Sequence, residues 1–521
     1  MCHKFTLYLH FLPNILKSAR IVGMGKNSLP EDFHNFRVHF VGIKGTGMAA
    51  LVEVLFKNGA VITGSDVSER FYTDEILEAL GIAALPFSES NVTKNIGLVI
   101  YSSAYKLDKN PDLIAAQRLG VPCMLYTEAL GAYSERAYSA GVCGVHGKTS
   151  TTGIAGTILS QLDLPAQALA GSVINSFGKK CVYTSPLFGG EQKFFVAETC
   201  EYQRHFMSFC PKIILLTSVE SDHQDYYPTF ADIQAAFVDY ILKLPQGGTL
   251  VYCADDAGAA ETAQIAANKR PDIALVPYGQ KAQGDWHLSY GTVGGQKNNF
   301  CVQFLGEAFL RVPGRHEVLD ACGAAALCAC LLRAAGKNPS DYIEKIKAGL
   351  EKFEGGKRRS EVTGRAKNSF GDDIVFVDDY GHHPTAVKTT LAGFKEFYGG
   401  KKIIVDFMSH TYSRTQALLK EFAQSFDSAD TVILNKIYAS ARENAAAFDI
   451  TGKTLADEAA KVHKDVHYKE EFDEAAAFGT DLLSQKAGDQ FPGGYLFVTM
   501  GAGDNWKVAQ KIMARFSEEG K

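Results

Sequence analysis

Residues 140–152 read AGVCGVHGKTSTT, and this stretch decides the fold expected for the middle of the chain. A short apolar run is followed by a turn that contains Gly144 and Gly147, and then by a helical pattern that begins at Lys148-Thr149. The backbone N–H groups of such a turn and the positive end of the helix dipole can surround phosphate oxygens. Lys148 would reach the outer phosphates of a nucleotide, and the Thr149 hydroxyl would bind Mg²⁺. The spacing is shorter than in the usual G-x-x-x-x-G-K-[ST] loop, so a glycine-rich turn with a solvated lysine is the alternative.

Outward from this stretch, two more segments repeat the pattern of a β-type run, a glycine-bearing turn and a helix. One begins at residues 37–41, and the other follows Glu354-Gly355-Gly356, with strands expected at 374–378, 402–407, 431–434 and 495–499. This alternation predicts α/β domains with mainly parallel sheets. We expect a Rossmann-like N-terminal domain, a central phosphate-loop domain and a Rossmann-like C-terminal domain. The expected limits are 1–36 for an N-terminal arm of unknown role, and 37–135, 136–353 and 354–521 for the three domains.

Composition narrows the class of protein. The chain has 521 residues, a net charge of −5, 46% hydrophobic and 21% charged residues, which is typical of a globular protein. Because no long basic run is present, nucleic acid and anionic membranes are not expected as partners. No apolar stretch reaches the ~18–20 residues needed to span a bilayer. The 11 cysteines form no CxxC pair, which indicates reduced thiols and a cytoplasmic protein. We expect either a monomer or a homodimer.

Two polar residues follow successive strands in the phosphate-loop segment. Glu198 comes after the run 194–197, and His223 comes after the run 213–217. Because the carboxyl ends of parallel strands meet in one crevice, a carboxylate and an imidazole there could hold divalent cations beside a nucleotide. An ordinary salt bridge for Glu198 and a hydrogen-bonded core imidazole for His223 are the alternatives. Nearby Glu220, Asp222 and Asp225 are interpreted as solvated loop acids.

The first segment carries a weaker signal, Gly42-x-x-Gly45-x-Gly47, with Asp66 about 20 residues further on. On its own this pattern fits a dinucleotide site, a diphosphate site or a tight strand-to-helix turn.

The third segment places titratable residues after two strands. Residues 378–384 read DDYGHHP, and Pro384 suits the first turn of a helix. Residues 410–415 read HTYSRT, in which Arg414 could clamp a carboxylate through two hydrogen bonds. A capping turn and a surface arginine are the alternatives.

Taken together and in this order, these motifs resemble those of the Mur ligase family. The resemblance runs from about His39 to about Lys507. It is carried by HFVGIKGTGM, ITGSD, YSSAY, GVHGKTSTT, VAETCEY, SVESDHQDYY, GRHEVLDA, GGKRRSE, VDDYGHHPT, SHTYSRT and TMGAGD. Two positions depart from the family pattern: Asp320 stands where Asn is common, and Thr411 stands where some members have Arg.

The resemblance implies roles for particular residues. The UDP-sugar residues would be Gly42, Gly45, Gly47, Ser65, Asp66, Ser102 and Ser103. The ATP residues would be Gly144, Val145, His146, Gly147, Lys148, Thr149, Ser150, Arg315, His316 and Asp378. Thr149, Glu198 and His223 would hold Mg²⁺, and with Lys148 they form the expected catalytic set. The amino-acid residues would be Tyr380, His382, His410 and Arg414.

The activity implied by the resemblance is ATP-dependent joining of L-alanine to the carboxylate of UDP-N-acetylmuramate, through an acyl phosphate, in peptidoglycan synthesis. Within the same family, a ligase that attaches a recycled tripeptide to this nucleotide is the nearest alternative. An NAD(P)-dependent oxidoreductase would leave the second phosphate loop unexplained. A non-catalytic nucleotide-binding module is disfavoured by the presence of Lys148, Thr149, Glu198 and His223.

Overall fold

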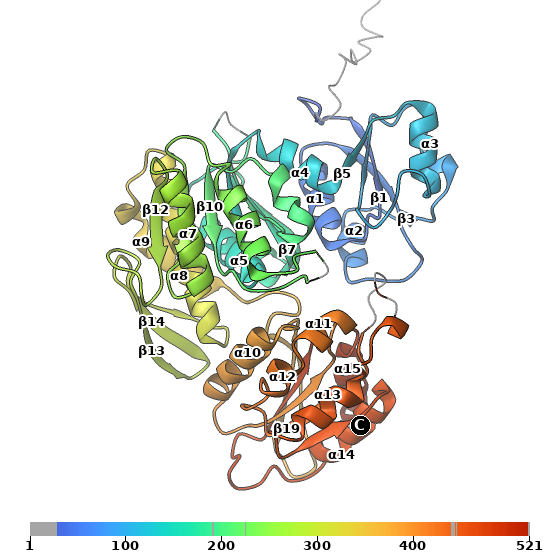
Figure 1. Ribbon diagram of the computed structural model, residues 1–521, viewed down its shortest axis with the longest axis vertical. Helices are drawn as coiled ribbons and strands as arrows, with labels where there is room; N and C mark the ends of the chain where they lie inside the picture. Colours follow the sequence, from blue (N-terminus) through green and yellow to red (C-terminus); the bar gives the residue numbers. More distant parts are fainter. Residues whose placement is uncertain (1–28, 190–191, 225, 439–442, 444, 519–521) are drawn as a thin grey trace, which may run out of the picture.

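The computed structural model describes residues 29–189, 192–224, 226–438, 443 and 445–518, which form three α/β parts (Figure 1). Most of the expected N-terminal arm lies outside the described residues. The remainder packs on the first part, because Leu29 and Phe33 are buried in its core.

The first part is a five-stranded parallel sheet with strand order β3-β2-β1-β4-β5. Its strands are β1 (Arg37–Val41), β2 (Val61–Ser65), β3 (Ala84–Leu85), β4 (Leu98–Tyr101) and β5 (Cys123–Leu125). The accompanying helices are α1 (Thr46–Lys57), α2 (Asp74–Ala79), α3 (Pro111–Leu119) and α4 (Tyr126–Ser134). Helix α3 shows why local sequence sets these limits. The Asn110 side chain caps its first N–H groups, and Gly120 adopts the left-handed conformation at its end.

The second part is a seven-stranded sheet, β12-β11-β10-β6-β9-β7-β8, in which only the β7–β8 pair is antiparallel. Its strands are β6 (Tyr138–Cys143), β7 (Ala166–Ile174), β8 (Lys180–Thr184), β9 (Phe194–Glu198), β10 (Ile213–Leu216), β11 (Thr249–Cys253) and β12 (Ala274–Tyr278). Its helices are α5 (Lys148–Leu159), α6 (Phe230–Ile241), α7 (Ala257–Lys269), α8 (Arg315–Ala334) and α9 (Ile343–Lys352). Cys322, Cys328 and Cys330 are buried in α8.

A small antiparallel sheet lies beside the second part, and sequence analysis did not predict it. Its strands are β13 (Leu288–Gly294), β14 (Lys297–Val302) and β15 (Gly306–Leu310). Alternate residues of β14 are buried against α8, including Phe300 and Val302. This one-sided burial gives a weaker apolar signal than a strand that is covered on both faces.

The third part is a six-stranded sheet, β16-β17-β21-β18-β19-β20, parallel except at β16–β17. Its strands are β16 (Glu361–Lys367), β17 (Asp373–Asp379), β18 (Lys402–Phe407), β19 (Thr431–Leu434), β20 (Val466–Tyr468) and β21 (Tyr495–Met500). Its helices are α10 (Pro384–Phe397), α11 (Tyr412–Ala417), α12 (Leu419–Ala423), α13 (Gly452–Ala459), α14 (Phe472–Leu483) and α15 (Trp506–Glu518). The expected α/β class with mainly parallel sheets is confirmed.

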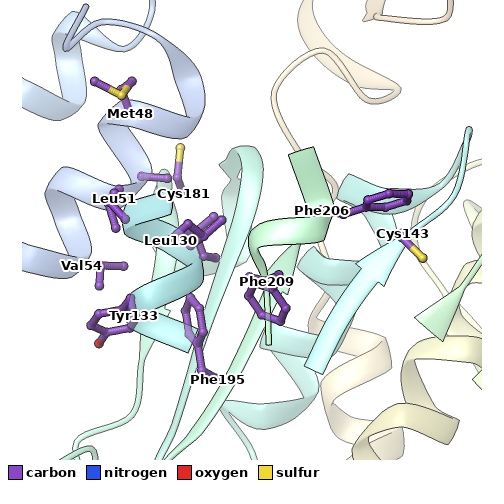
Figure 2. Close-up of a cluster of buried hydrophobic side chains, with 14 of the residues drawn as sticks. Met48, Leu51, Val54, Leu130, Tyr133, Cys143, Cys181, Phe195, Phe206 and Phe209 are labelled. Atoms are coloured by element: carbon purple, nitrogen blue, oxygen red, sulfur yellow. The ribbon is translucent and has the colours of Figure 1, made fainter. Parts of the chain in front are cut away.

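The first and second parts share one apolar cluster (Figure 2). Met48, Leu51 and Val54 project from α1, and Tyr133 of α4 meets Phe195 of β9 edge-on with ring centroids 5.1 Å apart. Because the cluster crosses from one sheet to the other, the glycine turn after β1 has a fixed position relative to the central sheet.

Among the described residues, no helix combines the length and the apolar character that crossing a bilayer requires.

Candidate active site

The phosphate loop lies between β6 and α5, where the sequence predicted it. Gly144 and Gly147 have φ angles of +138° and +78°, a region that favours glycine. A Cβ atom on Gly144 would lie 2.0 Å from Thr217 Oγ1, and one on Gly147 would lie 2.5 Å from Asp320 Oδ1. Glycine is therefore required at both positions by conformation and by space. The turn brings the N-terminus of the 12-residue helix α5 to a cavity.

Lys148 is held at the loop by Glu201, a residue that sequence analysis did not select. Its Nζ lies 3.0 Å from Glu201 Oε2, and it also donates to the Gly144 and Val145 carbonyl oxygens. Burial alone would lower the pKa of Lys148, but the Glu201 carboxylate outweighs it and raises that pKa to about 12. Burial likewise opposes ionisation of Glu201, whose pKa is nevertheless lowered by Lys148 and His223. The lysine is therefore a fixed cation at neutral pH.

Oxygen atoms that could bind a metal ion lie in the same cavity as the Lys148 ammonium group. The Thr149 hydroxyl donates to Glu198 Oε2 at 2.9 Å, and the Gly171 N–H donates to the same oxygen at 2.7 Å. His223 lines the same cavity, with Nε2 3.3 Å from Glu201 Oε1. A carboxylate and a hydroxyl in contact at the head of a phosphate loop suit a hard dication such as Mg²⁺. Thr149 and Glu198 therefore offer oxygen atoms that suit Mg²⁺. The assignment of Thr149, Glu198 and His223 as Mg²⁺ ligands stays a prediction.

The cavity around these groups has a volume of about 430 Å³ and is lined by both the second and the third parts. Of the residues predicted to bind ATP, metal or amino acid, those that line it are Val145, His146, Gly147, Lys148, Thr149, Ser150, Glu198, His223, His316, Tyr380 and His382. Those outside its lining are Gly144, Arg315, Asp378, His410 and Arg414.

Arg315 and Asp378 have other partners. The Arg315 side chain is 55% exposed, and its Nε lies 3.1 Å from Glu396 Oε2. The buried Asp378 carboxylate accepts hydrogen bonds from Arg358 Nε and Thr499 Oγ1, each at 2.8 Å. In this arrangement Asp378 stabilises the end of β17 through hydrogen bonds, whereas its neighbour Asp379 lines the cavity.

The carboxyl groups of Glu317 and Asp320 are buried beside the phosphate loop. Sequence analysis did not predict this pair. Ser150 Oγ donates to Glu317 Oε1 at 2.8 Å, and Asp320 faces Gly147 one turn further along α8. Burial raises the pKa of Glu317, and burial together with the Glu317 charge raises the pKa of Asp320 well above its usual range. A protonated Asp320 carboxyl has one O–H donor and one carbonyl oxygen, so it resembles the asparagine that is common at this position.

Arg414 forms a buried ion pair with Asp222 across the second and third parts. Its Nε and Nη2 lie 3.1 and 2.7 Å from Asp222 Oδ1, and its Nη1 donates to the His410 carbonyl at 2.9 Å. The interpretation of Asp222 as a solvated acid was therefore wrong, because Asp222 is only 5% exposed. Glu220 is half-buried and accepts from Thr385 Oγ1, so it is not a freely solvated acid either. Asp225 lies outside the described residues.

The expected amino-acid residues surround this ion pair. His382 Nδ1 bonds to the Tyr380 carbonyl at 2.9 Å, and burial, followed by the Arg414 charge, holds the pKa of His382 well below its usual range. The His410 ring stacks on Tyr438 with centroids 5.4 Å apart. The His382 imidazole thus lies near a permanent cation, the kind of group that binds a carboxylate.

At the glycine turn after β1, Asp66 is buried and stabilises the backbone of the turn through hydrogen bonds. Its carboxylate accepts from the Lys44 backbone N–H at 2.7 Å and from Tyr105 Oη at 3.0 Å. Ser65 is fully buried, Ser102 is half-buried and Ser103 is exposed. The buried Asp66 and Ser65 therefore support the turn from the protein interior, whereas Ser102 and Ser103 are accessible to a ligand.

A second cavity, of about 170 Å³, connects this turn to the central sheet. Gly47 and Tyr126 line it from the first part, and Gly171 and Phe206 line it from the second. Glu198 lines both cavities. The cavity at the phosphate loop and the cavity at the glycine turn after β1 therefore share the Glu198 side chain.

Three family profiles match in the order of the three sheets. They are the Mur ligase family catalytic domain at residues 37–138, the Mur ligase middle domain at 142–328, and the Mur ligase glutamate ligase domain at 358–503. The chain belongs to the Mur ligase family. The UDP-N-acetylmuramate–L-alanine ligase of Treponema pallidum (strain Nichols) is 45% identical over 499 residues, which cover 95% of this chain and 100% of that protein.

Solved structures share the Mur ligase fold seen here. The crystal structure of the UDP-N-acetylmuramate–alanine ligase from Thermotoga maritima aligns with a TM-score of 0.71 at 23% identity, covering 93% of this chain and 100% of the other. A murein peptide ligase from Psychrobacter arcticus aligns with a TM-score of 0.62 at 21% identity, covering 92% and 99%. At these identities the two structures support the fold alone.

Proposed function

We propose that this Mur ligase joins L-alanine to the carboxylate of UDP-N-acetylmuramate at the expense of ATP, a cytoplasmic step of peptidoglycan synthesis. The observation that carries the choice of substrates is the 45% identity to the Treponema pallidum ligase over that protein's whole length. The geometry supports it, because Glu198 lines both the phosphate-loop cavity and the cavity that reaches the first sheet.

The three parts would divide the substrates among them. Residues 37–135 would hold the UDP sugar, with the turn Gly42–Gly47 at the diphosphate and Ser102 and Ser103 beside the nucleotide or sugar. Residues 136–353 would hold ATP, and residues 354–521 would bring the amino acid. The shared apolar cluster fixes the first two parts to each other, whereas the third meets the second through the Asp222–Arg414 ion pair and the packing of α10 on α8, without a shared core of that kind among the described residues. Closure of the third part over the other two is therefore the expected movement on substrate binding.

In the first chemical step, a carboxylate oxygen of the muramate attacks the γ-phosphorus of ATP, the bond to the β-phosphate oxygen breaks, and ADP leaves. The N–H groups of the phosphate loop and the N-terminus of α5 would hold the phosphates. Lys148, cationic at neutral pH and fixed by Glu201, would offset the charge on the transferring group. Mg²⁺ held by Thr149, Glu198 and His223 would supply further positive charge there.

In the second step, the neutral amine of L-alanine attacks the acyl carbon, and the bond to the phosphate oxygen breaks. Phosphate leaves with one oxygen that came from the muramate carboxylate, and the amine loses a proton. Arg414, with Tyr380, His382 and His410, would position the amino acid through its carboxylate. An arginine has five N–H donors, and the three bonds to Asp222 and His410 leave two of them for a ligand. A closed cavity would exclude water from the acyl phosphate.

The test is phosphate release with ATP and UDP-N-acetylmuramate, screened over L-alanine, other amino acids and the tripeptide used in peptidoglycan recycling. The proposal predicts release that depends on both UDP-N-acetylmuramate and L-alanine. Release that depends on the tripeptide and not on L-alanine would assign the chain to recycling.

A further inference from the structure

Three side chains with metal-binding atoms meet at the junction of the second and third parts. His146 belongs to the phosphate loop, Glu220 follows β10, and His383 directly precedes α10, which packs on α8 (Figure 1). Glu220 Oε2 lies 3.3 Å from His146 Nε2 and 3.8 Å from His383 Nδ1. One ligand atom from each of the three side chains lies within 4.8 Å of the others.

His383 supplies a second, independent observation. Its side chain is only 9% exposed, and neither ring nitrogen has a hydrogen-bond partner among the residues that the structure describes. Buried imidazole nitrogens are nearly always paired with protein groups or water, so this ring lacks a partner that its position calls for. The Glu220 Oε2 atom lies 3.8 Å from His383 Nδ1, which is too distant for a hydrogen bond.

We propose that His146, Glu220 and His383 form a site for a transition-metal dication of the Zn²⁺ class, distinct from the Mg²⁺ ligands Thr149, Glu198 and His223. Zinc–nitrogen and zinc–oxygen distances near 2.1 Å place the ligand atoms of a tetrahedral site about 3.4 Å apart. The distances of 3.3 and 3.8 Å are close to that separation. Two imidazoles and one carboxylate are a donor set that favours zinc over magnesium.

The protonation states suit this role. Burial, followed by the His146 charge, lowers the pKa of His383 to about 4, so its imidazole is neutral at physiological pH. The hydrogen bond from His146 lowers the pKa of Glu220, which keeps the carboxylate ionised. Metal binding then requires little proton release from these two ligands. All three residues line the phosphate-loop cavity, so the fourth coordination position faces that cavity and would take water or a phosphate oxygen.

A metal at this position would link the phosphate loop to the start of α10. It would hold the third part against the second in the same arrangement as the Asp222–Arg414 pair does. The inference concerns metal binding by the nucleotide-free protein, and it does not depend on which amino acid is ligated.

The experiment titrates the full-length protein with Co²⁺, in the absence of nucleotide and with Mg²⁺ in large excess, and follows visible absorption. Four-coordinate Co²⁺ absorbs far more strongly than hydrated six-coordinate Co²⁺. We expect one strongly absorbing Co²⁺ per chain, displaced by Zn²⁺, and a rise in melting temperature with Zn²⁺ concentration. Glu220→Gln and His383→Asn should each weaken binding by at least about 100-fold, more than loss of an outer-shell partner does.

Two controls make the outcome decisive. His467→Asn removes another histidine paired with a carboxylate, Asp465 at 2.7 Å, and should leave Co²⁺ binding unchanged. Glu198→Gln removes an expected Mg²⁺ ligand and should also leave the absorption in place. The proposal would be overturned if the parent protein showed no strong absorption, or if a folded Glu220→Gln variant kept the parent affinity for Co²⁺. It would also be overturned if Glu198→Gln were the variant that lost the absorption while Glu220→Gln and His383→Asn kept it.

Discussion

Arg414 Nη2 lies 2.7 Å from Asp222 Oδ1, and both side chains are buried although 192 residues separate them in the chain. This ion pair ties the beginning of α11 in the third part to the loop after β10 in the second. The loop holding Asp222 also holds His223, and Arg414 also reaches the His410 carbonyl. The ion pair therefore connects His410 and Arg414, which are expected to bind the amino-acid substrate, with the loop that holds His223, an expected metal ligand.

We predict that Arg414→Ala and Asp222→Asn each lower the free energy of unfolding, and that the double variant loses less than the sum of the two. Removal of one partner leaves a buried charge unpaired, whereas removal of both does not. A double-mutant cycle from denaturant unfolding should give a coupling of about 0.5–3 kcal/mol. Strict additivity would show that the pair contributes nothing in solution.

The same pair predicts a pH dependence. Burial opposes ionisation of Asp222, but Arg414 holds the pKa of its carboxyl well below the usual range. Because the folded-state pKa is depressed, the stabilisation is fully present above the unfolded-state pKa of about 3.9 and is lost as the pH falls through the folded-state value. The stability difference between the parent and Asp222→Asn should therefore be constant near neutral pH and shrink below about pH 4. A difference that instead shrank between pH 6 and 8 would assign it to a histidine.

Arg414 is also predicted to bind the carboxylate of L-alanine. Loss of a charge-assisted contact worth about 1.5–3 kcal/mol corresponds to about 10–150-fold in affinity. Arg414→Ala should raise the KM for L-alanine by that order and leave the KM values for ATP and UDP-N-acetylmuramate nearly unchanged. Arg414→Lys should recover only part, because an ammonium cannot reproduce the planar fork.

Asp222→Asn separates this role from a structural one. Asp222→Asn keeps the Arg414 guanidinium but removes the carboxylate that holds it in place. The KM for L-alanine should therefore rise less than in Arg414→Ala. Equal effects of the two variants on that KM would indicate that Arg414 acts only by holding the parts together.

Lys148→Ala should lower kcat on the order of 10²–10³-fold or more, because one preorganised cation is lost at the transferring phosphoryl group. Circular dichroism should show that the fold is retained, since His223 still contacts the buried Glu201 carboxylate. Steady-state phosphate release measures the effect. A kcat within threefold of the parent would contradict the assignment of the phosphate loop.

Gly147→Ala tests the loop geometry, and Gly178→Ala provides a matched control. Both glycines have φ near +75°, at +78° and +74°, so both substitutions carry the backbone cost of about 1 kcal/mol. A Cβ on Gly178 would have no atom of the described residues within 4 Å, whereas a Cβ on Gly147 would lie 2.5 Å from Asp320 Oδ1. Gly147→Ala should therefore abolish ATP binding in calorimetry, and Gly178→Ala should only lower the melting temperature. Parent-like ATP affinity in Gly147→Ala would show that the loop does not hold nucleotide as proposed.

The parts of the site that sequence analysis predicted are those built from local geometry. The phosphate loop needs only a strand, a glycine turn and a helix in succession, and all three are written in residues 140–152. Glu201 and Asp222 were missed because their burial depends on partners elsewhere, Lys148 and Arg414. An acid in a loop is usually solvated, and nothing in its own neighbourhood distinguishes one that is buried by a distant arginine. Asp66 follows β2, and its hydrogen bonds with Lys44 and Tyr105 make it a structural support of the glycine turn, which the sequence pattern alone does not show.

The most direct test of the proposed ligation follows the oxygen atoms. UDP-N-acetylmuramate labelled with ¹⁸O in its muramate carboxylate is incubated with ATP and L-alanine, and the phosphate and the UDP product are analysed by mass spectrometry. The account predicts that each released phosphate carries one ¹⁸O and that L-alanine is joined to the nucleotide by an amide that retains the other. Unlabelled phosphate, or labelled phosphate without the alanyl product, would contradict it.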